Sequence, residues 1–527
     1  MKIERTKNAT RNIIFGMLLR LYQILIPFVL RTSMIYCMGV QYLGLNSLFT
    51  SVLQVLNLAE LGVGSAMVYC MYKPIAEDDR NTICALMKLY RLYYRIIGLV
   101  IAVIGIVLVP FIPKLVKGNI PVNINIYVLY LLNLGTTVLS YWLFAYRNSL
   151  VTAHQREDIT SKVTLISSTL MYVTQLSILY FVRNYYLYII VALLSQVFTN
   201  IITAIVTTKM YPQYKPVGKL DKSMVSDINQ RIRDLFTTKA FIIIIGSTDT
   251  IIISAFLGLV VLAVYQNYYY IISSIIGIMT VIYSACYVGI GNSIIVETKE
   301  KNFNDLKKFT LIISWIVGFC TVCLFCLFQP FMQVWVGKEL QLDFLIMSCL
   351  CLSFYIGEIN HLLNIYKDAA GLWRQDLYRP IVTALAKLLL NLILVHFWGI
   401  NGVILSSVFS NIFIGIPWLL RNLFTHLFER KNFVEYFKRL SIYAVITLFA
   451  CLVTGGLCYF VRLNVWLTLI TRAGICFIIP NIIFYIAFRN FPEFKLSLLL
   501  LDKMTNNKLS KIRIVVQKIG KGESGNI

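Results

Sequence analysis

Long apolar runs separated by short polar segments recur along the whole chain. A membrane-spanning helix needs about 20 predominantly apolar residues, and fourteen runs reach or approach that length. The expected spans are Asn12–Tyr36, Leu45–Tyr72, Leu89–Ile112, Ile124–Arg147, Ser161–Phe181, Tyr186–Thr208, Phe236–Phe256, Leu259–Ile290, Phe309–Phe331, Leu342–Tyr366, Ile381–Phe397, Gly402–Leu420, Leu440–Phe460 and Trp466–Phe488. The pattern predicts an all-α integral membrane protein with about 14 transmembrane helices.

The composition agrees with this pattern. Of the 527 residues, 58% are hydrophobic and only 14% are charged, whereas a soluble globular protein carries about 25% charged residues. The net charge is +24, but the basic residues stand in short clusters between the apolar runs. That distribution is typical of membrane topology rather than of a phosphate-binding surface, so no nucleic-acid partner is expected.

The positions of Lys and Arg predict the orientation. Segments on the side of the N-terminus hold 40 of the 48 basic residues, while the opposite side has six and the first span holds the remaining two. Because positive charge stays in the cytoplasm, both termini are expected there. The longest outer connection, Pro113 to Asn123, leaves no room for an outer catalytic domain. No nucleotide-binding loop, zinc motif or nucleophile elbow occurs, so no enzyme activity, metal or cofactor is expected.

An internal duplication relates two groups of six spans. The matching words are YLGLNSLFTSV (42–52) with FLGLVVLAVYQ (256–266), VPFIPKLVKG (109–118) with QPFMQVWVGK (329–338), and SQVFTNII (195–202) with SSVFSNIF (406–413). The expected parts are an N-lobe (1–208), a cytoplasmic linker (209–235), a C-lobe (236–421), two extra helices (422–488) and a basic cytoplasmic tail (489–527), which we expect to rest on anionic lipid head groups. An even number of spans per copy predicts a pseudo-two-fold axis along the membrane normal, with a binding site between the lobes.

Polar residues inside the first two spans are candidates for that site. Asn46 and Asn57 are eleven residues apart, so they share one face of a continuous helix, and Glu60 extends the same stripe. The stripe predicts a face toward the central cavity, and an interhelical hydrogen bond within one lobe is the alternative. Arg20 and Arg31 are also eleven apart in span 1. They predict a ladder for a phosphate or diphosphate group, or two separate interface anchors.

Four further ionisable residues lie in the spans of the second half. Asp249 is a candidate for proton or ion coupling and a possible partner of Arg31. Glu358 and His361 are three residues apart, a spacing that suits either a proton relay or a local salt bridge. Lys387 is a further cation for the substrate path. The coupling ion would be H⁺ or Na⁺, since the chain has no ATPase motif.

The cysteines do not predict a metal site. Cys320, Cys323 and Cys326 form a CxxCxxC sequence, but at this spacing they share one side of a buried helix. A metal cluster needs a fourth ligand and a surrounding loop. We therefore expect these thiols to act as packing residues.

The segment YLGLNSLFTSVLQVLNLAELGVGSAMVYCMYKPIAEDD (42–79) closely resembles bacterial Wzx-type polysaccharide repeat-unit flippases. These proteins belong to the multidrug/oligosaccharidyl-lipid/polysaccharide exporter superfamily, which also contains the MATE drug exporters. The resemblance extends over essentially the whole chain, and the LGLNSLF and LAELGxGSA words are its most specific parts.

This resemblance implies a transporter in the bacterial cytoplasmic membrane. Such proteins move an undecaprenyl-diphosphate-linked oligosaccharide to the outer leaflet for O-antigen, capsule or exopolysaccharide synthesis, by alternating access through a cationic cavity. Arg20, Arg31 and Lys387 would line the diphosphate path, and Glu60 and Asp249 would tune it. The expected partners are the lipid-linked substrate and membrane lipids, with a polysaccharide polymerase and a chain-length regulator left open. The alternative is a MATE-like, cation-coupled multidrug antiporter, which predicts an anionic cavity.

Overall fold

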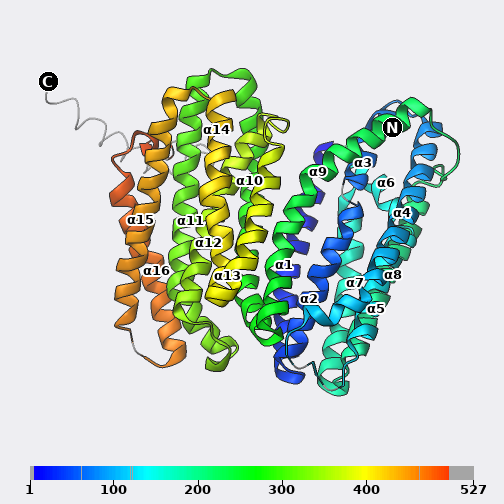
Figure 1. The fold of residues 1–527 in the computed structure, drawn as a ribbon. Helices are drawn as coiled ribbons and strands as arrows, with labels where there is room; N and C mark the ends of the chain where they lie inside the picture. The colour runs from blue at the N-terminus through cyan, green and yellow to red at the C-terminus, as the bar shows by residue number, and fades with distance from the viewer. Residues whose placement is uncertain are drawn as a thin grey trace. The chain divides into compact units, whose positions relative to one another are not determined.

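A computed structural model describes residues 5–60, 62–118, 120–121, 123–461, 463–495 and 497. In this part of the chain helices are joined by loops, without a β-strand (Figure 1). The expectation of an all-α membrane protein is therefore confirmed. The α-helices are α1 (Arg5–Cys37), α2 (Val40–Leu56), α3 (Val63–Ala76), α4 (Arg80–Leu108), α5 (Ile126–Trp142), α6 (Asn148–Ala153), α7 (Glu157–Ser177), α8 (Tyr185–Met210), α9 (Lys222–Ile252), α10 (Leu259–Val296), α11 (Lys299–Trp335), α12 (Phe344–Ala369), α13 (Tyr378–Ser410), α14 (Ile416–His426), α15 (Phe433–Tyr459) and α16 (Val465–Phe488).

The expected spans correspond to these helices. Within the described residues, ten helical segments are long and apolar enough to cross a membrane, and α5 with α6 makes an eleventh across a bend of 47°. The expected span Leu45–Tyr72 is divided between α2 and α3, and the seventh joins α9 to the π-helix Ile253–Leu257. The eleventh and twelfth share one segment, Tyr378–His426, which Gly399 interrupts with φ 54°. The count of about fourteen is consistent with this arrangement.

The chain forms two compact units, Met1–Gln266 and Asn267–Ile527, and the division falls within α10. We call them unit 1 and unit 2. Unit 1 extends past the linker expected at 209–235 because α9 packs against α2 and α3. The lobe boundaries expected from the sequence repeat, 1–208 and 236–421, remain a prediction.

In unit 1, two words of the proposed repeat meet directly. Gly44 of YLGLNSLFTSV lies against Leu259 of FLGLVVLAVYQ, and a Cβ added at Gly44 would stand 2.4 Å from the Leu259 carbonyl oxygen. Only a residue without a Cβ permits so close an approach of α2 to the start of α10. The glycine of the LGL word is therefore explained by helix packing in unit 1.

In unit 2, α11 is the packing centre. It contacts α12, α15 and α16, so the two extra helices expected at 422–488 are α15 and α16 packed on α11. One aromatic core joins Phe303 to Phe424 and Tyr436, and a second joins Tyr443 to Phe488. Ring packing thus joins the C-terminal helices to the unit, and an ion pair between Lys307 of α11 and Glu435 of α15 at 3.3 Å adds to it.

The segment after α16 is described only in part. Glu493 is buried and forms an ion pair with Arg439 of α15 at 2.6 Å. Residues 496 and 498–527, which make up most of the expected basic tail, lie outside the described part of the chain. The expected contact of this tail with lipid head groups therefore remains a prediction.

The close approach at Gly44 predicts that a Gly-to-Ala change lowers the stability of the protein, although the same change in the interior of a helix usually raises it. Gly44→Ala should lower the free energy of unfolding by about 1–3 kcal/mol because the new methyl overpacks the contact with Leu259. Gly135→Ala in α5, where no atom lies within 4 Å of an added Cβ, should raise it by up to about 1 kcal/mol through helix propensity. Thermal unfolding in detergent micelles measures both, and equal stability of the two variants would contradict the packing argument.

Candidate functional site

Glu60 lies at a break between two helices. The sequence predicted one continuous helix over Leu45–Tyr72, and this is wrong: α2 ends at Leu56, a 3₁₀ turn covers Asn57–Glu60, and α3 starts at Val63. Gly62 causes the break because its backbone is left-handed, with φ 88°, a conformation that favours glycine. The helical face counted from Asn46 through Asn57 therefore does not continue to Glu60. Asn46 and Asn57 are both half-buried.

Both oxygens of the Glu60 carboxylate accept a hydrogen bond from a tyrosine of unit 1. Tyr94 of α4 donates to Oε1 at 2.6 Å, and Tyr141 of α5 donates to Oε2 at 2.7 Å. Tyr90 donates to the Tyr94 hydroxyl at 2.7 Å. We call these four residues the Glu60 cluster. The cluster contains the interhelical hydrogen bonds that the sequence left as an alternative for Glu60.

The first turn of α3 leaves room for the Glu60 cluster. Glycine at position 64 leaves room for the tyrosines, since an added Cβ would lie 3.1 Å from the Tyr90 hydroxyl. An ionised carboxylate has no donor of its own, so two hydroxyl donors from different helices satisfy it without exposing it to lipid. The same carboxylate can also take up a proton or a small cation. The cluster is thus chemically suited to ion coupling, which stays a prediction for Glu60.

The sequence analysis missed the three tyrosines. The chain contains 32 tyrosines, so their number carries no signal. The spacing of Tyr90 and Tyr94 does place both hydroxyls on one face of α4. Tyr141 comes from another helix, and only the fold brings it to Glu60.

Arg20 and Arg31 lie on one helix, α1. Arg20 is exposed and Arg31 is half-buried. The same helix carries an exposed apolar stripe made of Leu18, Leu21, Leu25 and Val29. One residue turns a helix by about 100°, so both arginines lie on the side of α1 opposite to this stripe. Within unit 1, neither guanidinium group therefore lies on the exposed apolar stripe, which is the face of α1 best suited to lipid.

Unit 2 contains a second buried carboxylate with a tyrosine. Tyr283 of α10 donates a hydrogen bond to Glu358 Oε2 at 2.9 Å, and its ring lies 4.7 Å from that of His361. Glu358 is only 2% exposed. In the described part of the chain Tyr283 contacts both residues, and no ion pair joins Glu358 to His361. The local salt bridge that the spacing suggested is therefore absent from the described residues, and the proton relay between Glu358 and His361 remains a prediction.

Lys387 lies in the interior of unit 2, where it is 5% exposed. Asn391, one turn further along α13, accepts a hydrogen bond from Ser406 beyond the Gly399 break. Asp249 is half-buried near the end of α9 in unit 1. The structure thus places Lys387 in a buried polar row of α13. Its contact with substrate, and the pairing of Asp249 with Arg31, remain predictions.

Several solved structures share the fold of this chain. The lipid II flippase MurJ in an inward closed conformation aligns with a TM-score of 0.62 and 16% identity over 91% of this chain and 99% of its own. An inward-facing multidrug resistance MATE transporter of the MOP superfamily aligns at 0.58 and 14% identity, over 80% of this chain and 99% of its own. An outward-facing MATE transporter of the same superfamily gives 0.51 and 15% identity, over 82% and 96%.

These likenesses define a class of protein. The chain is a multi-pass membrane protein with the transporter fold shared by MurJ and the MATE proteins, and these structures are transporters and flippases rather than enzymes. No protein-family model matches the sequence, and no curated protein matches it. The narrower resemblance to polysaccharide repeat-unit flippases therefore remains a prediction.

The Glu60 cluster predicts energetic coupling between its members. Glu60→Ala and Tyr141→Phe should each destabilise unit 1, and the double variant should be more stable than the sum of the two losses predicts. The expected coupling is about 1.5–3 kcal/mol, because the hydrogen bond ends on a charged group. Unfolding free energies in mixed micelles measure this cycle.

The matched control replaces a tyrosine outside the cluster on the same helix. Tyr127 is 43% exposed, so Tyr127→Phe combined with Glu60→Ala should be additive within about 0.5 kcal/mol. If the effects of Tyr141→Phe and Glu60→Ala on the unfolding free energy were also additive, the hydrogen bond between Tyr141 and Glu60 would not contribute to stability.

Proposed function

We propose that this protein is a flippase that moves undecaprenyl-diphosphate-linked oligosaccharide repeat units from the cytoplasmic to the outer leaflet. The product would serve the synthesis of a cell-surface polysaccharide. A diphosphate cannot cross about 30 Å of hydrocarbon unaided. A protein that moves it must therefore supply cations along the path while the polyprenyl tail stays in lipid.

The observation that carries this proposal is the pair of arginines on α1. Arg20 and Arg31 are separated by three helical turns, about 16 Å, and both lie opposite the exposed apolar stripe of the helix. A guanidinium keeps its charge at any physiological pH and binds phosphate oxygens in a bidentate manner. Two such groups at successive depths could pass a diphosphate from one to the other. Lys387 is the proposed cation in unit 2.

The extent of the structural likeness supports the same choice. The alignment to the lipid II flippase covers 91% of this chain, and the alignments to the two MATE transporters cover 80% and 82%. MurJ is a lipid II flippase, and lipid-linked oligosaccharides are the related substrate class proposed here. Alternating access between the lobes is the proposed mechanism, with Glu60, Asp249, Glu358 and His361 as sites where H⁺ or Na⁺ would bind.

The proposal further assigns the protein to the bacterial cytoplasmic membrane with both termini in the cytoplasm. The distribution of Lys and Arg supports this orientation. A polysaccharide polymerase and a chain-length regulator are the expected functional partners of such a flippase, since they consume the translocated unit.

Translocation in proteoliposomes tests the proposal. Vesicles carry a fluorescent polyprenyl-diphosphate oligosaccharide in the inner leaflet, and an impermeant quencher reports its arrival outside. Arg20→Ala combined with Arg31→Ala should slow translocation at least about tenfold, because one lost charge-assisted contact costs about 1.5–3 kcal/mol. The initial quenching rate is the measured quantity.

The matched control removes two arginines from α4. Arg80 and Arg95 are both exposed, and Arg80→Ala combined with Arg95→Ala should leave the rate within about twofold of wild type. Translocation that survives loss of Arg20 and Arg31 would reject the arginine path. No translocation by wild-type protein, even under imposed proton or sodium gradients, would reject the flippase.

A MATE-like antiporter for small organic cations is the second candidate. The half-buried carboxylate of Glu60 and the buried one of Glu358 each accept a hydrogen bond from a tyrosine hydroxyl. They favour this candidate because a cation substrate requires an anionic site. Uptake of an organic cation that depends on a proton or sodium gradient, and is lost in Glu60→Gln, would support this candidate. The same vesicles serve both assays.

A further inference from the structure

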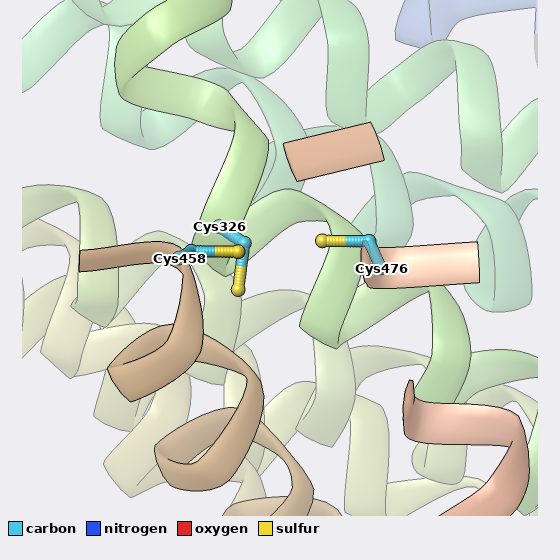
Figure 2. A group of neighbouring side chains, drawn as sticks. All are labelled: Cys326, Cys458 and Cys476. Atoms are coloured by element: carbon cyan, nitrogen blue, oxygen red, sulfur yellow. The ribbon is translucent and has the colours of Figure 1, made fainter. Parts of the chain in front are cut away.

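Three cysteines from three different helices of unit 2 converge in the interior. Cys326 belongs to α11, Cys458 to α15 and Cys476 to α16, and their Sγ atoms all lie within 4.8 Å of one another. Their exposed fractions are 5%, 2% and 0%. Figure 2 shows Cys476 reaching from α16 toward the other two side chains. We call these residues the thiol cluster.

The thiol cluster differs from the group seen in the sequence. Of the CxxCxxC residues, Cys326 belongs to it and Cys323 lies beside Cys476. The other two thiols of the cluster come from α15 and α16. The expectation that Cys326 acts only in packing rested on the lack of further ligands near α11 in the sequence. The fold supplies those ligands from residues more than a hundred positions away.

The dimensions suit a thiolate metal site. Zinc binds cysteine sulfur at about 2.3 Å in tetrahedral geometry, which places ligand sulfurs about 3.8 Å apart. The thiols, at no more than 4.8 Å, would need to approach by about 1 Å or less. Rotation about the side-chain bonds of cysteine can supply that movement without displacing a helix.

A positive charge lies next to the thiol cluster. Arg472 precedes Cys476 by one turn of α16. Its Nη2 donates to the Val461 carbonyl oxygen at 3.3 Å, and its buried Nε has no hydrogen-bond partner in the described part of the chain. Three thiolates around one Zn²⁺ carry a net charge of −1, which Arg472 would neutralise. A divalent ion is therefore favoured over Cu⁺, whose three-thiolate site would leave a net negative charge in the apolar interior.

A polar pocket in unit 2 is lined by residues that lie one helical turn from two of the three thiols. It has a volume of about 460 Å³, and Gln329, Gln333, Lys338 and Arg472 are among its lining residues. Gln329 follows Cys326 by one turn of α11, and Arg472 is one turn from Cys476. The orientation expected from the basic residues would put this end of the helices outside. A metal ion would enter, and the thiol protons would leave, through this pocket.

We propose that Cys326, Cys458 and Cys476 bind one Zn²⁺ ion and thereby fasten the α15–α16 pair to α11. On binding, each thiol loses its proton to solvent through the pocket and forms one Zn–S bond, so three protons leave and no oxidant is needed. A water molecule from the pocket is the neutral fourth ligand. This proposal is independent of the transported substrate.

Metal analysis of the full-length, tag-free protein in detergent micelles tests the proposal. Reduced protein is stripped with chelator, incubated with Zn²⁺ and separated from free ion by gel filtration. Wild type should retain one zinc per chain, and Cys476→Ala should retain less than about one tenth of that. Cd²⁺ replaces Zn²⁺ as a spectroscopic probe, and its thiolate charge-transfer absorption should appear in wild type and disappear in Cys458→Ser.

Cys84→Ala is the matched control because Cys84 is a buried cysteine of unit 1, and it should retain the full stoichiometry. Arg472→Gln should keep one site but weaken zinc binding about tenfold or more. Zn²⁺ should also raise the unfolding temperature of wild type and not that of Cys458→Ser, which excludes a variant that merely fails to fold. Absence of bound zinc in reduced wild type, or zinc retained equally by Cys476→Ala, would overturn the proposal.

Discussion

The hydrocarbon of a membrane does not solvate polar groups, and the structure of this protein depends on that constraint. Backbone amides and carbonyls must find partners within the chain, which leaves the helix as the solution for a protein of this composition. The constraint is stricter for ionisable side chains, since a charge at bilayer depth costs at least about 2.5 kcal/mol. Each polar cluster described above meets this requirement in its own way.

The Glu60 cluster illustrates how the chain meets this requirement. The break at Gly62 releases backbone groups from regular helical bonding and brings the carboxylate toward α4 and α5, where Tyr94 and Tyr141 receive it. In unit 2, Glu358 meets Tyr283 in a similar arrangement. A tyrosine hydroxyl can stabilise a carboxylate in its ionised form and accept a hydrogen bond from it when protonated. Such a partner suits a group that changes its protonation during transport.

The arginines of α1 and the thiols of unit 2 meet the constraint differently. Arg20 and Arg31 cannot lose their charge, so the helix turns them away from its exposed apolar stripe. The three thiols are neutral and apolar enough to be buried when protonated. On metal binding they would become thiolates, and the charge of Arg472 would then be needed. In both proposals a guanidinium neutralises an anionic group: Arg20 and Arg31 the diphosphate, and Arg472 the zinc-bound thiolates.

The sequence by itself determined the helical class, the approximate number of spans and the side on which basic residues gather. These properties depend on the composition of single segments, because each run must match the bilayer thickness by itself. It also pointed to Glu60, Arg20 and Arg31, since an ionisable residue in an apolar run is conspicuous without any structure. The helix break at Gly62 was visible only as two nearby glycines, and the continuous-helix interpretation was wrong there. Only the tertiary structure decided that Tyr94 and Tyr141 meet Glu60, that Gly44 lies against Leu259, and that Cys326 meets Cys458 and Cys476. These contacts join residues far apart in the chain, and helix packing, which no local pattern encodes, brings them together.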